Sequence, residues 1–146
     1  MTLKELLIRH EGKRTRPYLC TAGKRTIGVG HNFDDNPLPP DIDAFLEDNG
    51  YITDEMIDTL LEQDIEDATG FCHKLYPNFD SFTENRQNAL IDFLFVGYGT
   101  AKQFKNTNRA INEERWDDAA DGLLASKYAR QVGKRARDLA SMLRDG

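Results

Sequence analysis

The chain has 146 residues, of which 30% are charged and 39% hydrophobic, and its formal net charge is −6 at pH 7. This length suits one ordinary domain that can bury a core without disulfides. No apolar run approaches the roughly 20 residues of a membrane-spanning helix, and the N-terminus lacks the apolar stretch of a signal peptide, so we expect neither a membrane protein nor an exported one. The acidic balance argues against nucleic acid as a partner, because phosphate binding requires clustered Lys and Arg.

The charge is distributed unevenly along the chain. Residues 1–33 carry a net charge of +5, residues 34–100 one of −14 and residues 101–146 one of +3. A cleft lined by the two basic ends would attract an anionic polymer even though the whole chain would not. The acidic middle is equally typical of a plain solvated surface.

The two cysteines, Cys20 and Cys72, are too few for a disulfide framework. Two free thiols are the expected state in a reducing compartment. A bridge between them is the alternative.

The first helix is predicted to begin after Thr2 and to stop at Gly12. Thr2 and Glu5 have the spacing of a capping box, and glycine is a common residue after the end of a helix. Glu11 then lies in the last turn, where the helix dipole and unsatisfied carbonyls disfavour a charged carboxylate. A carboxyl group that keeps its proton can serve as a general acid. The alternative is an ordinary solvated helix-end residue.

A β-hairpin is predicted directly after this helix. The run that ends in Tyr18-Leu19-Cys20 is followed by a turn at Thr21-Ala22-Gly23 and by the alternating segment Thr26-Ile27-Gly28-Val29-Gly30-His31. A carboxylate, a thiol, a hydroxyl and an imidazole therefore lie within residues 11–31. Such a density of reactive groups favours a functional site here.

The rest of the chain is predicted to be mostly helical. Residues 32–40 are rich in Pro and Asp and indicate an exposed loop, and residues 42–46 suit either a short helix or an irregular packed loop. A long helix should start at Thr53, and Asp64 lies within its apolar stripe, where a carboxylate needs a partner. From Thr83 onward only helices are expected, with residues 89–96 in a buried central one.

The spacing of the candidate residues resembles that of a known enzyme family. Glu11, eight residues, Cys20, five residues, Thr26 and then Ile-Gly-Val-Gly-His is similar to the active-site signature of the phage-type lysozymes, or endolysins. The resemblance continues in order over nearly the whole chain, through Ile52-Thr53-Asp54-Glu55, Gln63-Asp64-Ile65, Arg115-Trp116-Asp117-Asp118-Ala119-Ala120 and Lys134-Arg135-Ala136-Arg137.

The resemblance implies a mostly helical α+β fold in a single lysozyme-like domain covering residues 1–146. It would have two lobes. A small β-hairpin lobe would span about residues 12–60, and a long helix would connect it to a larger helical lobe of about residues 70–146 plus the N-terminal helix.

The resemblance also implies hydrolysis of the β-1,4 bond between N-acetylmuramic acid and N-acetylglucosamine in peptidoglycan, without metal or cofactor. Glu11 would be the general acid, and Cys20 and Thr26 would hold or activate a water on the opposite face, giving inversion. Cys20 stands where the family more commonly has Asp. A free thiol is mostly neutral at pH 7 unless cations such as Lys24 or Arg25 lower its pKa.

Further residues are assigned by the same resemblance. His31 and Asp64 would form a structural ion pair that ties the hairpin to the long helix. Arg135 would come from the larger lobe to meet Glu11, or would simply be a solvated residue at a helix start. Substrate-binding positions would be Asn32, Phe95 and Thr107, with a core role as the alternative for Phe95.

The implied biology is that of an endolysin. We expect a monomer that stays in the host bacterial cytoplasm until lysis and reaches the wall with the help of a holin. Two other functions remain open. A lytic transglycosylase would use Glu11 as acid and then base and would need no carboxylate at position 20, whereas a non-catalytic wall-binding module would have lost turnover.

Overall fold

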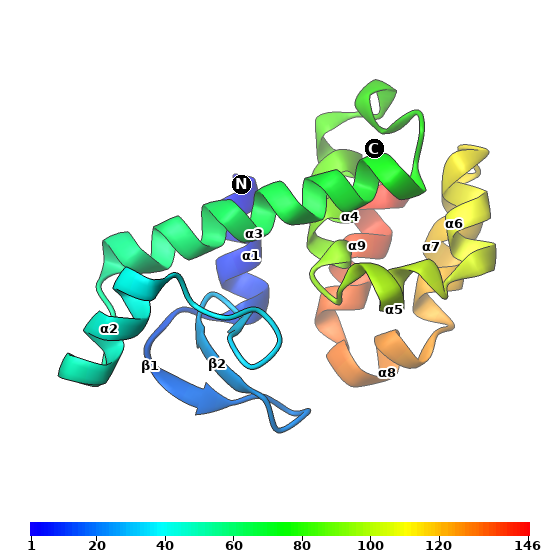
Figure 1. Ribbon diagram of the computed structural model, residues 1–146. Coiled ribbons are helices and arrows are strands. Elements are labelled where there is room, and N and C mark those ends of the chain that lie inside the picture. The colour runs from blue at the N-terminus through cyan, green and yellow to red at the C-terminus, as the bar shows by residue number, and fades with distance from the viewer. The chain divides into compact units, whose positions relative to one another are not determined.

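The computed structural model describes all 146 residues and has the predicted mostly helical α+β fold. The chain forms two compact units, residues 1–65 (the N-terminal unit) and residues 66–146 (the C-terminal unit). None of the helices combines the length and the apolarity needed to cross a bilayer. In chain order the elements are α1 Leu3–Glu11, β1 Arg14–Leu19, β2 Arg25–Gly28, β3 His31–Asn32, α2 Pro40–Asn49, α3 Asp54–Leu75, the 3-10 turn η1 Phe79–Ser81, α4 Glu84–Leu94, α5 Tyr98–Lys102, α6 Lys105–Asn112, α7 Trp116–Leu124, α8 Lys127–Val132 and α9 Lys134–Asp145 (Figure 1).

Helix α1 has the predicted ends. The Thr2 hydroxyl accepts the Glu5 N–H, the Glu5 side chain accepts the Thr2 N–H, and Gly12 ends the helix with a φ of 77°. Lys4 binds Asp58 and Glu62 of α3 at 2.9 Å each. The contacts thus group α1 with residues 1–65. The predicted division into a small lobe and a larger lobe stays a prediction.

The predicted hairpin is present as part of a three-stranded antiparallel sheet in the order β1-β2-β3. Leu19 pairs with Arg25, and the loop between the strands is closed by the Cys20 N–H, which donates to the Lys24 carbonyl at 3.0 Å. Gly23 adopts a φ of 75° in this loop, a conformation that glycine reaches without strain. Strand β2 is buried from Thr26 to Gly28.

Residues 40–49 form helix α2, so the short-helix alternative for this segment is the one found. Pro40 occupies its first turn, where a missing N–H costs nothing, and Gly50 closes it in the left-handed conformation. The buried side chains of Leu38 and Ile42 anchor the segment.

Helix α3 begins where the sequence predicted, with the Thr53 hydroxyl accepting the Met56 N–H. Part-way along this helix, Oδ2 of Asp64 lies 2.8 Å from Nδ1 of His31, which is the expected pair. The Nε2 of the same ring lies 2.9 Å from the Asn36 carbonyl. Figure 1 shows α3 as the long green helix, with α1 and the strands drawn in blue.

In the C-terminal unit, α9 packs against α4, α7 and α8. Residues Ala89–Leu94 of α4 are all buried, including Asp92, whose side chain is fully buried. Nε of Arg135 on α9 bonds to Oδ1 of Asp92 at 2.8 Å, and a second guanidinium nitrogen bonds to the Asp92 carbonyl at 3.1 Å. This charge-assisted pair satisfies a carboxylate that would otherwise be costly to bury.

We predict that Asp64→Asn lowers the free energy of unfolding. The amide oxygen can still accept from His31, but the charge that favours the protonated ring is lost, at a cost of about 1–2 kcal/mol. Urea denaturation followed by circular dichroism at pH 6 measures the loss. Glu66→Gln, which removes an exposed charge from the same helix, is the matched control. Equal stability of Asp64→Asn and the wild type would contradict a stabilising role for the pair.

Candidate active site

The candidate thiol lies in the loop that joins β1 and β2. The Cys20 carbonyl accepts the Gly23 N–H at 2.8 Å, and its own N–H donates to the Lys24 carbonyl. Both cysteines are free thiols, Cys20 being half-buried and Cys72 fully buried. The structure therefore does not contain the alternative, a disulfide between Cys20 and Cys72.

The surroundings of Cys20 lower the pKa of its thiol. The largest cause is a hydrogen bond from the Lys24 backbone N–H, and the Ala22 backbone and the Thr26 hydroxyl add to it. From the sequence, the side-chain charges of Lys24 and Arg25 were the potential cause of a lowered pKa. Those side chains are paired with Asp35 and Asp34, and hydrogen bonds from the loop backbone are the main cause of the lowered pKa of this thiol.

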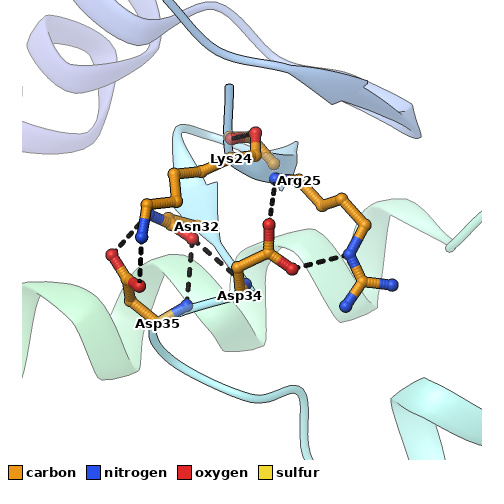
Figure 2. Close-up of polar contacts among 6 residues, drawn as sticks. Lys24, Arg25, Asn32, Asp34 and Asp35 are labelled. Carbon is orange, nitrogen blue, oxygen red and sulfur yellow. Dashed lines mark hydrogen bonds and ion pairs between the residues drawn. The ribbon is translucent and has the colours of Figure 1, made fainter. Parts of the chain in front are cut away.

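The charges of Lys24 and Arg25 are neutralised by the loop that follows β3 (Figure 2). Nζ of Lys24 lies 2.8 Å from Oδ1 of Asp35, and Nε of Arg25 lies 2.6 Å from Oδ1 of Asp34. The Asp34 carboxylate also accepts the Arg25 backbone N–H at 2.7 Å. These pairings hold the hairpin loop against residues 32–35.

Thr26 is almost completely buried, with 3% of its surface exposed. Its hydroxyl lies 3.0 Å from the Lys24 carbonyl and within hydrogen-bonding reach of the Cys20 sulfur, and its proton can be donated to only one of the two at a time. A hydroxyl has one proton and two lone pairs. While the proton points to the Lys24 carbonyl, the oxygen lone pairs are left to accept a hydrogen bond from a water or from substrate.

Glu11 packs against the turn between β2 and β3. A Cβ atom added to Gly30 would collide with Oε2 of Glu11 and would lie only 2.7 Å from its Cδ. Gly30 also has a φ of 65°, which disfavours any other residue. The turn has room for the Glu11 side chain because residue 30 is a glycine.

Tyr18 on β1 is a further member of the site. Burial raises the pKa of its phenol most, and the nearby negative charges of Glu11 and Cys20 raise it further, against the opposing charge of Arg14. The Arg14 guanidinium lies 4.5 Å from the centre of the ring. Tyr18 is thus within electrostatic reach of both Glu11 and Cys20.

Neither Tyr18 nor Gly30 was predicted from the sequence to belong to the site. The signal for Gly30 was its place between a buried strand and His31, where a glycine permits close approach of another chain segment. No comparable signal marked Tyr18.

Asn32, a predicted substrate-binding residue, is engaged in the loop of Figure 2. Its Oδ1 accepts the backbone N–H groups of Asp34 and Asp35 at 3.0 and 3.1 Å, and its Nδ2 donates to the Asp35 carboxylate. Most of its hydrogen-bonding capacity is therefore used within the loop. A role toward substrate stays a prediction.

Three predicted site residues belong to the C-terminal unit. Phe95 is half-buried at the end of α4, and Arg135 makes its described bonds to Asp92. Thr107 is buried on α6, with its hydroxyl packed against Gly122 of α7, and it lines a pocket of about 260 Å³. The roles of these three residues toward substrate or Glu11 stay predictions.

We predict that Cys20 and Cys72 differ sharply in reactivity. Because the pKa of Cys20 is lowered, its alkylation by iodoacetamide should rise with pH at a lower midpoint than in the urea-unfolded chain, where free Cys titrates at about 8.5. Burial raises the pKa of Cys72 to about 12, so this thiol should stay unmodified until the chain unfolds. Peptide mass mapping over a pH series distinguishes the two, and a Cys20 midpoint at or above the unfolded value would contradict the description of its loop.

We predict that Gly30→Ala displaces the Glu11 side chain. The new methyl group would overlap the carboxylate and would also strain a backbone with positive φ, which costs about 1–2 kcal/mol of stability. Gly23→Ala is a matched control, since it has the same backbone strain but nothing within 4 Å of the added Cβ. A crystal structure of Gly30→Ala with an unmoved Glu11 would refute the predicted overlap.

Comparison with known proteins supports the resemblance. The family model described as phage lysozyme matches residues 8–142. Two relatives from Dictyostelium discoideum, described as probable T4-type lysozymes 2 and 1, are 30% and 24% identical to the chain, and each alignment covers 99% of this chain and 95% of the relative. The pre-baseplate central spike protein Gp5 of Enterobacteria phage T4 is 28% identical over the whole of this chain, which corresponds to 28% of that protein. The chain therefore belongs to the phage lysozyme family.

Proposed function

We propose that the protein is a muramidase that hydrolyses the β-1,4 bond between N-acetylmuramic acid and N-acetylglucosamine in peptidoglycan. The observation that carries the proposal is the arrangement of Glu11, Cys20 and Thr26 around one small sheet in a chain of the phage lysozyme family. Glycoside hydrolysis needs an acid on the leaving oxygen and a group that activates water. The three residues supply these two kinds of group.

Glu11 is the proposed general acid. It is the last residue of α1, directly before Gly12, which ends the helix. Its packing against Gly30 restricts where the side chain can go. A proton donor whose side chain is restricted in this way stays close to the glycosidic oxygen of a substrate bound beside it.

Cys20 and Thr26 are the proposed partners of the attacking water. The lowered pKa of the thiol increases the fraction of thiolate, which can accept a proton from water. The Thr26 oxygen can accept a second hydrogen bond from the same water while its proton is held by the Lys24 carbonyl. Attack by this water on the face opposite Glu11 would give inversion.

A lytic transglycosylase is the second candidate, and the absence of a carboxylate at position 20 permits it. In that reaction Glu11 would act as acid and then as base, with the muramic acid 6-hydroxyl as internal nucleophile. A non-catalytic wall-binding module is the third candidate. The presence of both Glu11 and Thr26 argues against it.

The remaining biology belongs to the same proposal. The protein would act as a monomer, stay in the bacterial cytoplasm until lysis, and reach the wall through a holin. Arg135 would restrain Glu11, and Phe95, Thr107 and Asn32 would contact the glycan.

We predict that Glu11→Gln abolishes release of muropeptides from purified peptidoglycan. Loss of a general acid typically lowers kcat by about 10²- to 10⁴-fold. Mass spectrometry of the digest should find reducing muropeptides that carry one added water with the wild-type protein and almost none with the variant. Glu47→Gln, an exposed change on α2, is the control and should retain activity.

The products decide among the three candidates. Anhydro-muropeptides would replace the hydrolase by a transglycosylase. Absence of products from a folded wild-type protein would favour the wall-binding module.

A further inference from the structure

The peptide group between Lys24 and Arg25 connects the candidate catalytic residues to the loop after β3. Its carbonyl accepts both the Cys20 N–H and the Thr26 hydroxyl, each at 3.0 Å. Its N–H donates to Oδ2 of Asp34 at 2.7 Å. Because a trans peptide is planar, its N–H and carbonyl point in opposite directions, so fixing one fixes the other.

Asp34 supplies a bond that a neighbouring strand would otherwise make. Strand β3 pairs with Thr26 and Ile27 of β2 but ends at Asn32. The next N–H toward the start of β2 is that of Arg25, and the Asp34 carboxylate accepts it (Figure 2). The Arg25 carbonyl is satisfied by the Phe33 N–H at 3.0 Å.

The Asp34 carboxylate is itself held in place by its neighbours. Its Oδ1 binds Nε of Arg25 at 2.6 Å, and the Asn32 side chain accepts the backbone N–H groups of Asp34 and Asp35. Asp35 adds a second link between loop and hairpin, since it binds Nζ of Lys24 and Nδ2 of Asn32. A carboxylate that accepts an N–H also polarises the peptide and makes its carbonyl a better acceptor.

We propose that Asp34 is a positioning residue for this active site, acting through the Lys24–Arg25 peptide group on Cys20 and Thr26, with Asp35 and Asn32 holding the loop that carries it. Asp34 does not touch the reacting atoms. It sets the direction of the carbonyl that receives the Thr26 proton, and it keeps the hairpin loop in the conformation whose backbone N–H groups face the Cys20 sulfur. This inference rests on the proposed function for its kinetic consequence, but its structural consequence can be measured without substrate.

Three variants separate the backbone bond from the ion pair. Asp34→Ala removes both bonds of the carboxylate. Asp34→Asn keeps an oxygen that can accept the Arg25 N–H, so it should rescue most of the loss. Arg25→Ala removes the ion pair, and its stacking on Phe33 at 4.9 Å, while leaving the backbone N–H that Asp34 binds.

The first readout is the pH midpoint of Cys20 alkylation in the folded protein. Asp34→Ala should shift this midpoint upward toward the value in the unfolded chain, while Arg25→Ala and Asp34→Asn should stay near the wild type. The charged and titratable groups that face Cys20 are Lys24 and Tyr18, and the charge of Asp34 acts on Lys24 in turn. Asp34→Asn removes the same charge as Asp34→Ala, so a shift caused by the lost charge would appear in both variants. A shift confined to Asp34→Ala therefore reports the loop conformation.

The second readout is the kinetics of peptidoglycan digestion. Asp34→Ala should lower kcat by about 10- to 100-fold, as expected for a small misplacement of reacting groups, with KM nearly unchanged. Asp34→Asn should recover most of this loss. If Asp34 only stabilised the fold, Asp34→Ala would reduce the amount of folded protein. The pH midpoint of Cys20 alkylation and the kcat per folded molecule would then equal those of the wild type.

The outcomes are distinct. An unshifted Cys20 midpoint in Asp34→Ala, or an equal shift in Arg25→Ala, would overturn the inference. If Asp34→Ala fails to fold, the Cys20 midpoints of Asp34→Asn and Arg25→Ala are compared instead. A midpoint shift in Arg25→Ala alone would overturn the inference. A midpoint shift confined to Asp34→Ala in a protein that releases no muropeptides would support the positioning role while rejecting the proposed hydrolase.

Discussion

One imidazole ring joins three separate parts of the N-terminal unit. His31 pairs with Ile27 in the sheet, its Nδ1 faces Asp64 of α3, and its Nε2 faces the Asn36 carbonyl. Both partners are acceptors, so only the protonated ring can donate to both. The ring thereby fixes β3, α3 and the loop after β3 to one another. That loop follows the strand that begins at His31, binds the hairpin through Asp34, and is held at Asn36 by the same ring.

The C-terminal unit solves a related problem with a different pair. Asp92 is fully buried on α4, and Arg135 on α9 satisfies it with bonds to both side chain and backbone. The planar guanidinium suits this double contact, which an ammonium could not reproduce. In each unit, a buried or half-buried acid therefore fixes a helix to a neighbouring element.

The sequence predicted the elements that have local signals. The capping box of Thr2, the stop at Gly12, the hairpin and the start of α3 all depend on nearby residues. The apolar stripe indicated that Asp64 needs a partner, and the resemblance to the family named His31 as that partner. The main cause of the lowered Cys20 pKa, the loop backbone, was not predicted, and neither were the partners of Lys24 and Arg25, which lie about ten residues away in a loop without periodicity. The contact between Glu11 and Gly30 joins a helix to a turn, and its only signal in the sequence is the glycine itself, which does not reveal its partner.

The Asp34 carboxylate, which accepts the Arg25 N–H, also affects how the edge of the sheet can interact with other chains. Where β3 ends, β2 would otherwise present an uncovered N–H to solvent, and such an edge can recruit a strand from another molecule. Asp34 fills that position with a negative charge, and Asp35 adds a second one beside it. A strand arriving at this edge would have to displace a charge-assisted bond and approach two acids, so the two carboxylates make this end of β2 unfavourable for pairing with another chain.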